Sequence, residues 1–150
     1  MGLSLLRSFL VRHRRIAIDT SVFIYELEAN PRYAALCDPI FSWLETPGHS
    51  AVTSTITMTE LLVQPYREAD QKRVDEFYGL LVTYPNLEWV APDLEIAGLA
   101  AQLRARYGLR PPDALQAATA IRSQATGLVT NDRILERVDG FETLVLERVR

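Results

Sequence analysis

Short apolar runs alternate with longer amphipathic segments along the whole chain. The runs are mostly apolar rather than alternating with polar residues, a pattern typical of strands that are buried on both faces. It predicts strands at 15–19, 49–54, 87–91, 128–130 and 142–146. Between these runs, apolar residues recur at helical spacing. This spacing predicts helices at 21–28, 32–44, 57–64, 68–83, 93–107, 113–126 and 132–138.

Proline and glycine mark several of the expected helix boundaries. Pro65 is expected to end a helix at Gln64, because a proline inside a helix removes a backbone hydrogen bond. Pro92 suits the first position of the next helix, and Gly108 suits its end. Pro39 predicts an irregularity within the second helix.

The alternation of strands and helices predicts the fold class. We expect an α/β fold with a short parallel β-sheet flanked by helices on both faces, an α/β/α arrangement. The chain has no repeat and no Gly/Ser linker, so we expect one domain at 15–150 preceded by an N-terminal extension at 1–14. The extension is either a short amphipathic helix or an upstream segment that the fold does not need.

Acidic residues occur where the predicted strands end or where the following helices begin. Asp19 follows the first strand, Asp132 follows the fourth, and Glu60 and Asp113 lie near helix starts. The carboxyl ends of parallel strands share one edge of the sheet, where ligands bind. Four carboxylates at one edge repel one another unless a cation compensates them. A hard divalent cation such as Mg²⁺ or Mn²⁺ would do so and would support phosphodiester cleavage.

Each acid also has a purely structural interpretation. Asp19 and Asp132 could cap the helices that follow them. Glu60 could form a capping box with Thr57, and Asp113 could interact with the dipole of its own helix. These interpretations explain each acid separately, but they do not predict that all four lie at one edge.

Composition narrows the possible functions. The net charge of −3 gives no overall attraction to nucleic acid, so an anionic partner requires a local basic patch. A single cysteine, Cys37, excludes an intrachain disulfide and favours a cytoplasmic protein. One cysteine and two histidines make a zinc site improbable. No apolar run approaches the roughly 20 residues of a membrane span, so no membrane is expected as a partner.

Four segments resemble the motifs of a known family, the PIN domain, and most closely its VapC-type toxin ribonucleases. They occur in the family's order and read IAIDTSVFI, STITMTELL, RPPDALQAATAI and LVTNDR. The resemblance implies a metal-dependent endoribonuclease with a PIN-like fold, the toxin of a toxin–antitoxin pair. It also implies a small antitoxin protein as partner, a homodimer and an RNA substrate. The N-terminal extension departs from the family, whose first strand starts close to the first residue.

The resemblance assigns roles to individual acids. Asp19, Glu60, Asp113 and Asp132 match the acidic quartet and would be the catalytic residues. Asp19 and Asp113 would bind the Mg²⁺, with Mn²⁺ as a possible substitute. Glu60 and Asp132 would complete the metal shell or position the attacking water.

Neighbouring polar residues would support these acids. Ser21 could hydrogen-bond a carboxylate, and Thr130 and Asn131 would do similar work behind the metal ligands. Arg110 and Arg133 adjoin the acids in sequence and are candidates for contacts with RNA phosphate.

Other functions remain open at this level. The chain could be a housekeeping RNA-processing nuclease without an antitoxin, or a non-catalytic PIN-like binding module. A receiver-type phosphoacceptor domain also carries acids at strand ends, but it needs a lysine late in the chain. The lysine here is Lys72, which comes too early.

Overall fold

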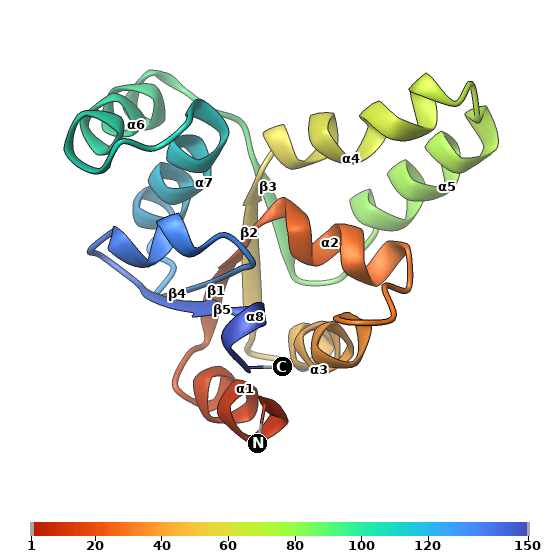
Figure 1. Cartoon of the computed structure of the whole chain (residues 1–150), viewed down its shortest axis with the longest axis horizontal. Coiled ribbons are helices and arrows are strands. Elements are labelled where there is room, and N and C mark those ends of the chain that lie inside the picture. Colours follow the sequence, from red (N-terminus) through yellow and green to blue (C-terminus); the bar gives the residue numbers. More distant parts are fainter. Residues whose placement is uncertain (1, 150) are drawn as a thin grey trace.

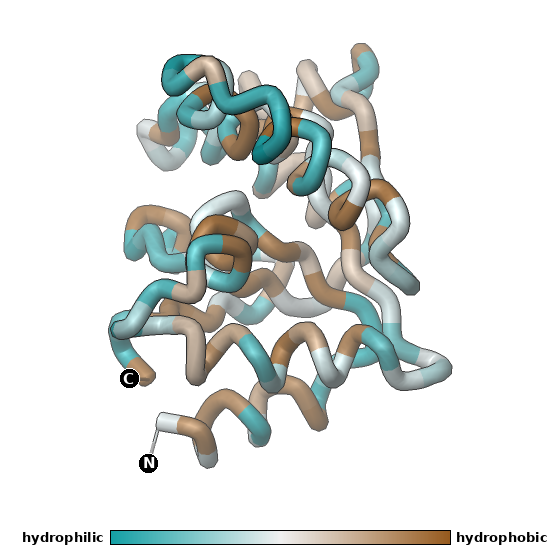
Figure 2. Tube along the Cα trace, turned by 90° about the vertical axis from the view of Figure 1, so that its right-hand side faces the viewer, coloured by the Kyte–Doolittle hydropathy of each residue, from teal (hydrophilic) through white to brown (hydrophobic). Residues whose placement is uncertain are grey.

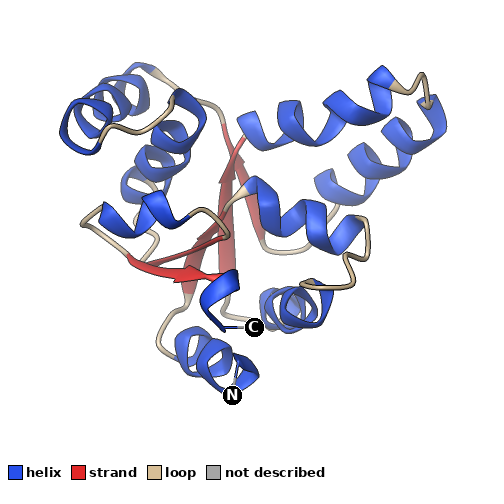
Figure 3. Ribbon diagram, in the orientation of Figure 1, coloured by secondary structure: helices blue, strands red, loops and turns tan. Residues whose placement is uncertain are grey.

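Five parallel strands form the centre of the computed structural model, which describes residues 2–149. Their order in the sheet is β3-β2-β1-β4-β5, and Figure 3 shows them between the helices. Their bounds are β1 (Arg15–Ile18), β2 (Ser50–Ser54), β3 (Leu87–Val90), β4 (Gly127–Thr130) and β5 (Glu142–Val145). All the strands run in one direction, so their carboxyl ends lie at one edge. The predicted parallel sheet is confirmed.

Helices cover both faces of the sheet, which confirms the predicted α/β/α class (Figure 1). The helices α1, α2, α3 and α8 lie on one face, and α6, α7 and the 3₁₀ helix η1 lie on the other. The pair α4 and α5 extends from the sheet as an arm. The bounds are α1 (Gly2–Val11), α2 (Thr20–Leu27), α3 (Ala34–Glu45), α4 (Ile56–Arg67), α5 (Gln71–Val82), α6 (Leu94–Tyr107), α7 (Pro111–Arg122), η1 (Arg133–Arg137) and α8 (Leu146–Val149).

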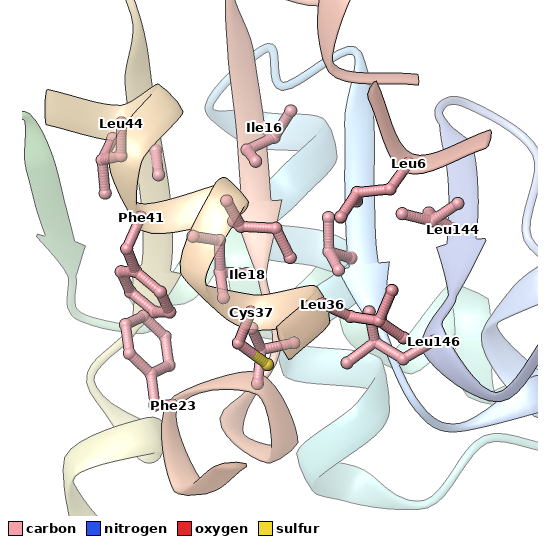
Figure 4. Close-up of a cluster of buried hydrophobic side chains, with 14 of the residues drawn as sticks. Leu6, Ile16, Ile18, Phe23, Leu36, Cys37, Phe41, Leu44, Leu144 and Leu146 are labelled. Atoms are coloured by element: carbon pink, nitrogen blue, oxygen red, sulfur yellow. The ribbon is translucent and has the colours of Figure 1, made fainter. Parts of the chain in front are cut away.

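Each face of the sheet has its own hydrophobic core, because successive side chains of a strand point to opposite faces. Ile16 and Ile18 of β1 pack into the core with α1, α2 and α3, which Figure 4 shows in detail. Ala17, between them, packs into the core with α6 and α7. This two-sided burial explains why the strands are apolar throughout.

Residues 2–11 form α1, which carries hydrophobic and hydrophilic residues along its length (Figure 2). Its side chains Leu6 and Phe9 are almost fully buried in the first core. The Phe9 ring packs so close to Gly127 of β4 that a Cβ atom there would come within 2.7 Å of it. Arg12, just after α1, contacts Glu142 of β5 at 2.6 Å. The division into an N-terminal extension at 1–14 and a domain at 15–150 stays a prediction.

The predicted end of α4 was wrong. The helix continues through Pro65 to Arg67, because a proline costs one backbone hydrogen bond without forcing the chain to leave the helix. The turn follows at Ala69, which adopts a left-handed φ of 52°. Asp70 then caps α5 by accepting a hydrogen bond from the Arg73 N–H at 3.0 Å, so α5 begins later than predicted.

Other helix boundaries differ by a few residues. Pro92 lies before the cap residue Asp93 rather than inside α6, whereas Gly108 ends that helix in the left-handed conformation as predicted. Pro111 and Pro112 are the first residues of α7 and do not precede it. No helix was predicted at α8, because one short turn has no measurable periodicity.

A partly buried carboxyl group at the contact between α2 and α3 predicts a dependence of stability on pH. Burial and the neighbouring Asp38 raise the pKa of Glu26 to about 7. Stability is therefore expected to fall as the pH rises from about 4.5 to about 7. Glu26→Gln should reduce this loss of stability by about 1–2 kcal/mol. The effect is smaller than the full pKa shift implies, because solvent screens the partly exposed carboxyl.

Urea unfolding at pH 5 and pH 8 measures this effect. Glu28→Gln, an exposed neighbour on the same segment, is the control and should keep the wild-type difference between the two pH values. An unchanged difference in Glu26→Gln would contradict the assignment.

Candidate active site

A cavity of about 340 Å³ opens at the carboxyl ends of β1 and β4. The chain passes from β1 to β2 on one side and later returns to β4 on the other, so the cavity lies where the strand order reverses. Open parallel sheets bind ligands at this place. The lining includes all the predicted acids, which are Asp19, Glu60, Asp113 and Asp132.

Asp19 lies almost buried at the floor of this cavity and caps α2. Its Oδ1 accepts a hydrogen bond from the Thr20 N–H at 2.9 Å, and its Oδ2 accepts one from the Thr130 hydroxyl at 2.7 Å. Burial raises the pKa of Asp19 to about 6, against the lowering effect of these hydrogen bonds. The negative charges of Asp113 and Glu60 add to the rise. The capping role and the position at a candidate site therefore coincide.

Asp113 lies in the first turn of α7 and is also buried. Burial and the charge of Asp132 raise its pKa, while Arg110 opposes the rise. Arg110 Nε donates to Asp113 Oδ2 at 3.2 Å, and Arg110 Nη2 lies 3.6 Å from Asp132 Oδ2. One guanidinium group thus faces two of the acids.

Asp132 caps η1, where its Oδ1 accepts a hydrogen bond from the Ile134 N–H at 3.1 Å. The Asp132 N–H donates to the Thr130 hydroxyl at 3.0 Å, and that hydroxyl donates to Asp19. Thr130 therefore links the acid after β1 to the acid after β4.

Glu60 lies on α4, and its Oε1 accepts a hydrogen bond from the Thr20 hydroxyl at 2.7 Å. The capping box with Thr57 does not form. Thr55 is the cap position of α4, and Thr57 lies within the helix with its hydroxyl fully buried. Glu60 is exposed and lines the cavity. Its carboxylate is held there by the hydrogen bond from Thr20.

Ser21 and Asn131 hold the loop after β4. The Ser21 hydroxyl accepts a hydrogen bond from the Asn131 N–H at 3.2 Å. The Asn131 side chain donates to the Tyr25 hydroxyl at 2.9 Å and accepts from the Glu147 N–H at 2.8 Å. These contacts join the loop to α2 and α8.

The two predicted phosphate-binding arginines differ in position. Arg110 lines the cavity with its side chain 74% exposed. Arg133 Nη2 instead contacts Glu147 Oε2 at 3.3 Å, and Arg133 is not part of the cavity lining.

Three polar residues in or beside the cavity lining had no predicted role, and these are Thr20, Thr53 and Gln116. Thr20 belongs to the motif of Asp19 but was given no role. Gln116 offered one signal in the sequence, because it is a polar residue inside the alanine-rich run DALQAATA.

The donor set fits a hard divalent cation. Asp19 and Asp113 are buried carboxylates with raised pKa values, so a cation between them would offset their repulsion. Magnesium is commonly held by one or two carboxylates together with water and substrate phosphate. Within residues 2–149, no group of three acidic, histidine or cysteine side chains is close enough to form a metal site unaided. A metal held by Asp19 and Asp113 would therefore need water or substrate oxygens to complete its shell.

The comparison with known families agrees with this geometry. The model of the PIN domain matches residues 16–141. No curated protein matches the sequence significantly. Among helices of the described chain, none is long and apolar enough to cross a membrane.

Several solved structures share the fold. The structure of VapBC2 from Rickettsia felis, bound to a DNA fragment from the VapBC2 promoter, has a TM-score of 0.66. Its identity is 16% over 87% of this chain and 98% of that chain. DNA-bound VapBC from Salmonella typhimurium has a TM-score of 0.66 and 22% identity over 88% and 98%. VapBC-5 from Mycobacterium tuberculosis, a member of the VapBC family of toxin-antitoxin systems, has a TM-score of 0.57 and 22% identity over 88% and 97%. At these identities the likeness establishes the fold.

Proposed function

Because the chain belongs to the PIN domain family, we propose that it is a metal-dependent endoribonuclease that cleaves RNA phosphodiester bonds in the acidic cavity. The observation that supports this most is the burial of two carboxylates, Asp19 and Asp113, in one cavity at the carboxyl ends of the strands. Buried carboxylates cost stability unless positive charge compensates them. Arg110 compensates Asp113 and Asp132 only in part, because its side chain is largely exposed, and a bound cation would account for the burial of both carboxylates.

Asp19 and Asp113 would hold Mg²⁺, or Mn²⁺ in its place. Such an ion lowers the pKa of a bound water and offsets the charge that builds on phosphate oxygens. Thr130 would keep Asp19 oriented, because its hydroxyl bonds Asp19 Oδ2 at 2.7 Å.

The exposed groups at the cavity would handle substrate and water. Glu60 would accept a proton from the attacking water, and Asp132 would complete the shell of oxygen ligands. Arg110 would contact an RNA phosphate, since its guanidinium is largely exposed at the cavity rim. Arg133 would do so only after leaving Glu147.

Cleavage of a mixed RNA pool tests this function. The wild type should cut RNA with Mg²⁺ or Mn²⁺, and excess EDTA should stop the reaction. Asp113→Asn should lose the activity. Asp139→Asn is the matched control, because Asp139 is exposed and lies outside the cavity lining. Equal cutting by the wild type and Asp113→Asn would refute the proposal.

We further propose that the enzyme is the toxin of a toxin–antitoxin pair and that it forms a homodimer. The structural neighbours support the pairing with an antitoxin, since several of them are toxin–antitoxin assemblies. An apolar hollow on α4, lined by residues that include Met58, Leu62, Val63 and Tyr66, offers a surface for a small antitoxin protein.

Expression in cells separates the toxin from a housekeeping nuclease. Growth arrest that Asp113→Asn abolishes supports the toxin. Unimpaired growth, together with RNA cleavage by the purified protein, would favour an RNA-processing enzyme without antitoxin. Light scattering of the purified chain measures whether it is a dimer.

A further inference from the structure

A chain of buried polar side chains leads from Thr20 in the cavity lining into the protein interior. Thr20 of α2, Thr53 of β2, Thr57 of α4 and Gln116 of α7 are each at most 6% exposed. Figure 1 shows α2, α4 and α7 around the same end of the sheet. Buried polar groups cost free energy unless they are hydrogen-bonded, so the pattern of donors and acceptors in this group is restricted.

The orientation of the Gln116 amide follows from its neighbours. Its Oε1 accepts a hydrogen bond from the Ser54 N–H at 3.2 Å. The Nε2 group therefore faces Thr57 and donates to its hydroxyl oxygen at 2.6 Å. An amide NH₂ can only donate, so Thr57 must accept here.

The proton of Thr57 is assigned by Thr53. Thr53 donates its one hydroxyl proton to the Ile18 carbonyl at 2.9 Å, and a carbonyl can only accept. The two hydroxyls of Thr53 and Thr57 lie 2.7 Å apart. Because the Thr53 proton is already used, Thr57 is the donor in this pair.

Thr20 completes the arrangement. Its hydroxyl lies 3.2 Å from Thr57 Oγ1 and 2.7 Å from Glu60 Oε1. The proton of Thr57 is already donated, so Thr20 donates, mainly to the carboxylate, because charged acceptors form the stronger bond. The Thr57 hydroxyl therefore donates to Thr53 of β2 and accepts from Gln116 of α7. It also lies beside the Thr20 hydroxyl of α2, whose proton goes mainly to Glu60.

We propose that Thr57 is a positioning residue, whose hydroxyl anchors the first turns of α4 and so fixes Glu60 beside Thr20 and Asp19. Thr57 and Glu60 are three residues apart and share a face of α4, so an anchor at one sets the place of the other. This inference rests on the proposed ribonuclease function.

Isosteric substitutions at Thr57 test this role. Thr57→Val keeps the shape but removes the hydroxyl, and it should lower kcat for RNA cleavage by about 10- to 100-fold with little change in KM. Thr57→Ser keeps the hydroxyl and should recover most of that loss. Thr119→Val is the matched control, because Thr119 is equally buried but donates only to the Leu115 carbonyl of its own helix.

A double substitution shows whether the effect passes through Glu60. In a Glu60→Gln background, Thr57→Val should lower kcat little further, because the carboxylate that Thr57 positions is already absent. A general structural defect would instead lower the activity equally in both backgrounds. If Thr57→Val does not fold, Gln116→Met removes one anchor of the same hydroxyl from α7 and should also lower kcat.

The outcomes separate this inference from the proposed function. If Asp113→Asn is inactive while Thr57→Val cuts RNA as well as Thr119→Val, the ribonuclease stands and the positioning role is wrong. Full additivity with Glu60→Gln also overturns the positioning role. If Asp113→Asn retains full activity, the proposed function and the inference both fail.

Discussion

Replacing Asp19 with asparagine is expected to abolish RNA cleavage and, in the same molecule, to stabilise the fold at pH 8. Loss of a group that supports a metal ligand commonly costs about 10- to 100-fold in activity, so loss of a ligand itself should exceed about 100-fold. Asparagine keeps the size of the side chain and an oxygen that can accept from the Thr20 N–H. The variant therefore removes the charge and also puts an amide NH₂ in place of the Oδ2 that accepts from the Thr130 hydroxyl.

The sign of the stability effect follows from the pKa of Asp19. Burial raises it from 3.8 to about 6, so the folded protein favours the protonated carboxyl. Stability from this group is present below pH 4 and is lost as the pH rises through 6. At pH 8, where the carboxyl is charged, Asp19→Asn should gain about 1–2 kcal/mol, since one pKa unit corresponds to about 1.4 kcal/mol and the lost hydrogen bond from Thr130 offsets part of the gain.

Urea unfolding without divalent cations, at pH 8 and pH 4, measures the gain. The difference between Asp19→Asn and the wild type should be largest at pH 8 and small at pH 4. Asp139→Asn, with an exposed carboxylate, should match the wild type in stability and in cleavage. A destabilised Asp19→Asn at pH 8 would show that the charge of Asp19 is compensated within the fold.

Phe9→Ala is expected to destabilise the protein by about 3–5 kcal/mol, the usual cost of removing a buried aromatic side chain. Phe9 is 1% exposed, and its ring packs against His13 with the centroids 4.5 Å apart. Because α1 lies at the end of the sheet opposite the cavity, RNA cleavage below the unfolding temperature should persist.

Thermal and urea unfolding measure this effect. The control is Val11→Ala, since Val11 is 85% exposed on the same helix and should change stability by no more than about 0.5 kcal/mol. A loss of unfolding free energy below about 1 kcal/mol in Phe9→Ala would support an independent domain at 15–150. Replacing a core residue of that domain with alanine would cost more than this.

Strands were predictable because two-sided burial leaves a local record in the sequence. Ile16, Ala17 and Ile18 are consecutive apolar residues, and the two cores on opposite faces explain all three. The end of α4 was not predictable in the same way. Pro65 argues for a boundary, but it lies buried within α4, and its burial depends on the tertiary structure.

The acids of the candidate site were predictable because each follows a strand or begins a helix, and parallel topology then brings them to one edge. Their partners were not. Thr57 reads as a helix cap from its neighbours in sequence, yet its hydroxyl contacts Thr20 and Gln116, which lie far away along the chain.

The sequence alone determined the fold class, the strands and the acidic residues at the carboxyl edge of the sheet, since these depend on local patterns of burial and on chain order. Tertiary structure decided which acids are buried, that Arg110 faces the cavity while Arg133 is paired with Glu147, and that α1 joins the core. The burial of a side chain and its hydrogen-bond partners depend on residues from all parts of the chain. A short stretch of sequence therefore does not determine them.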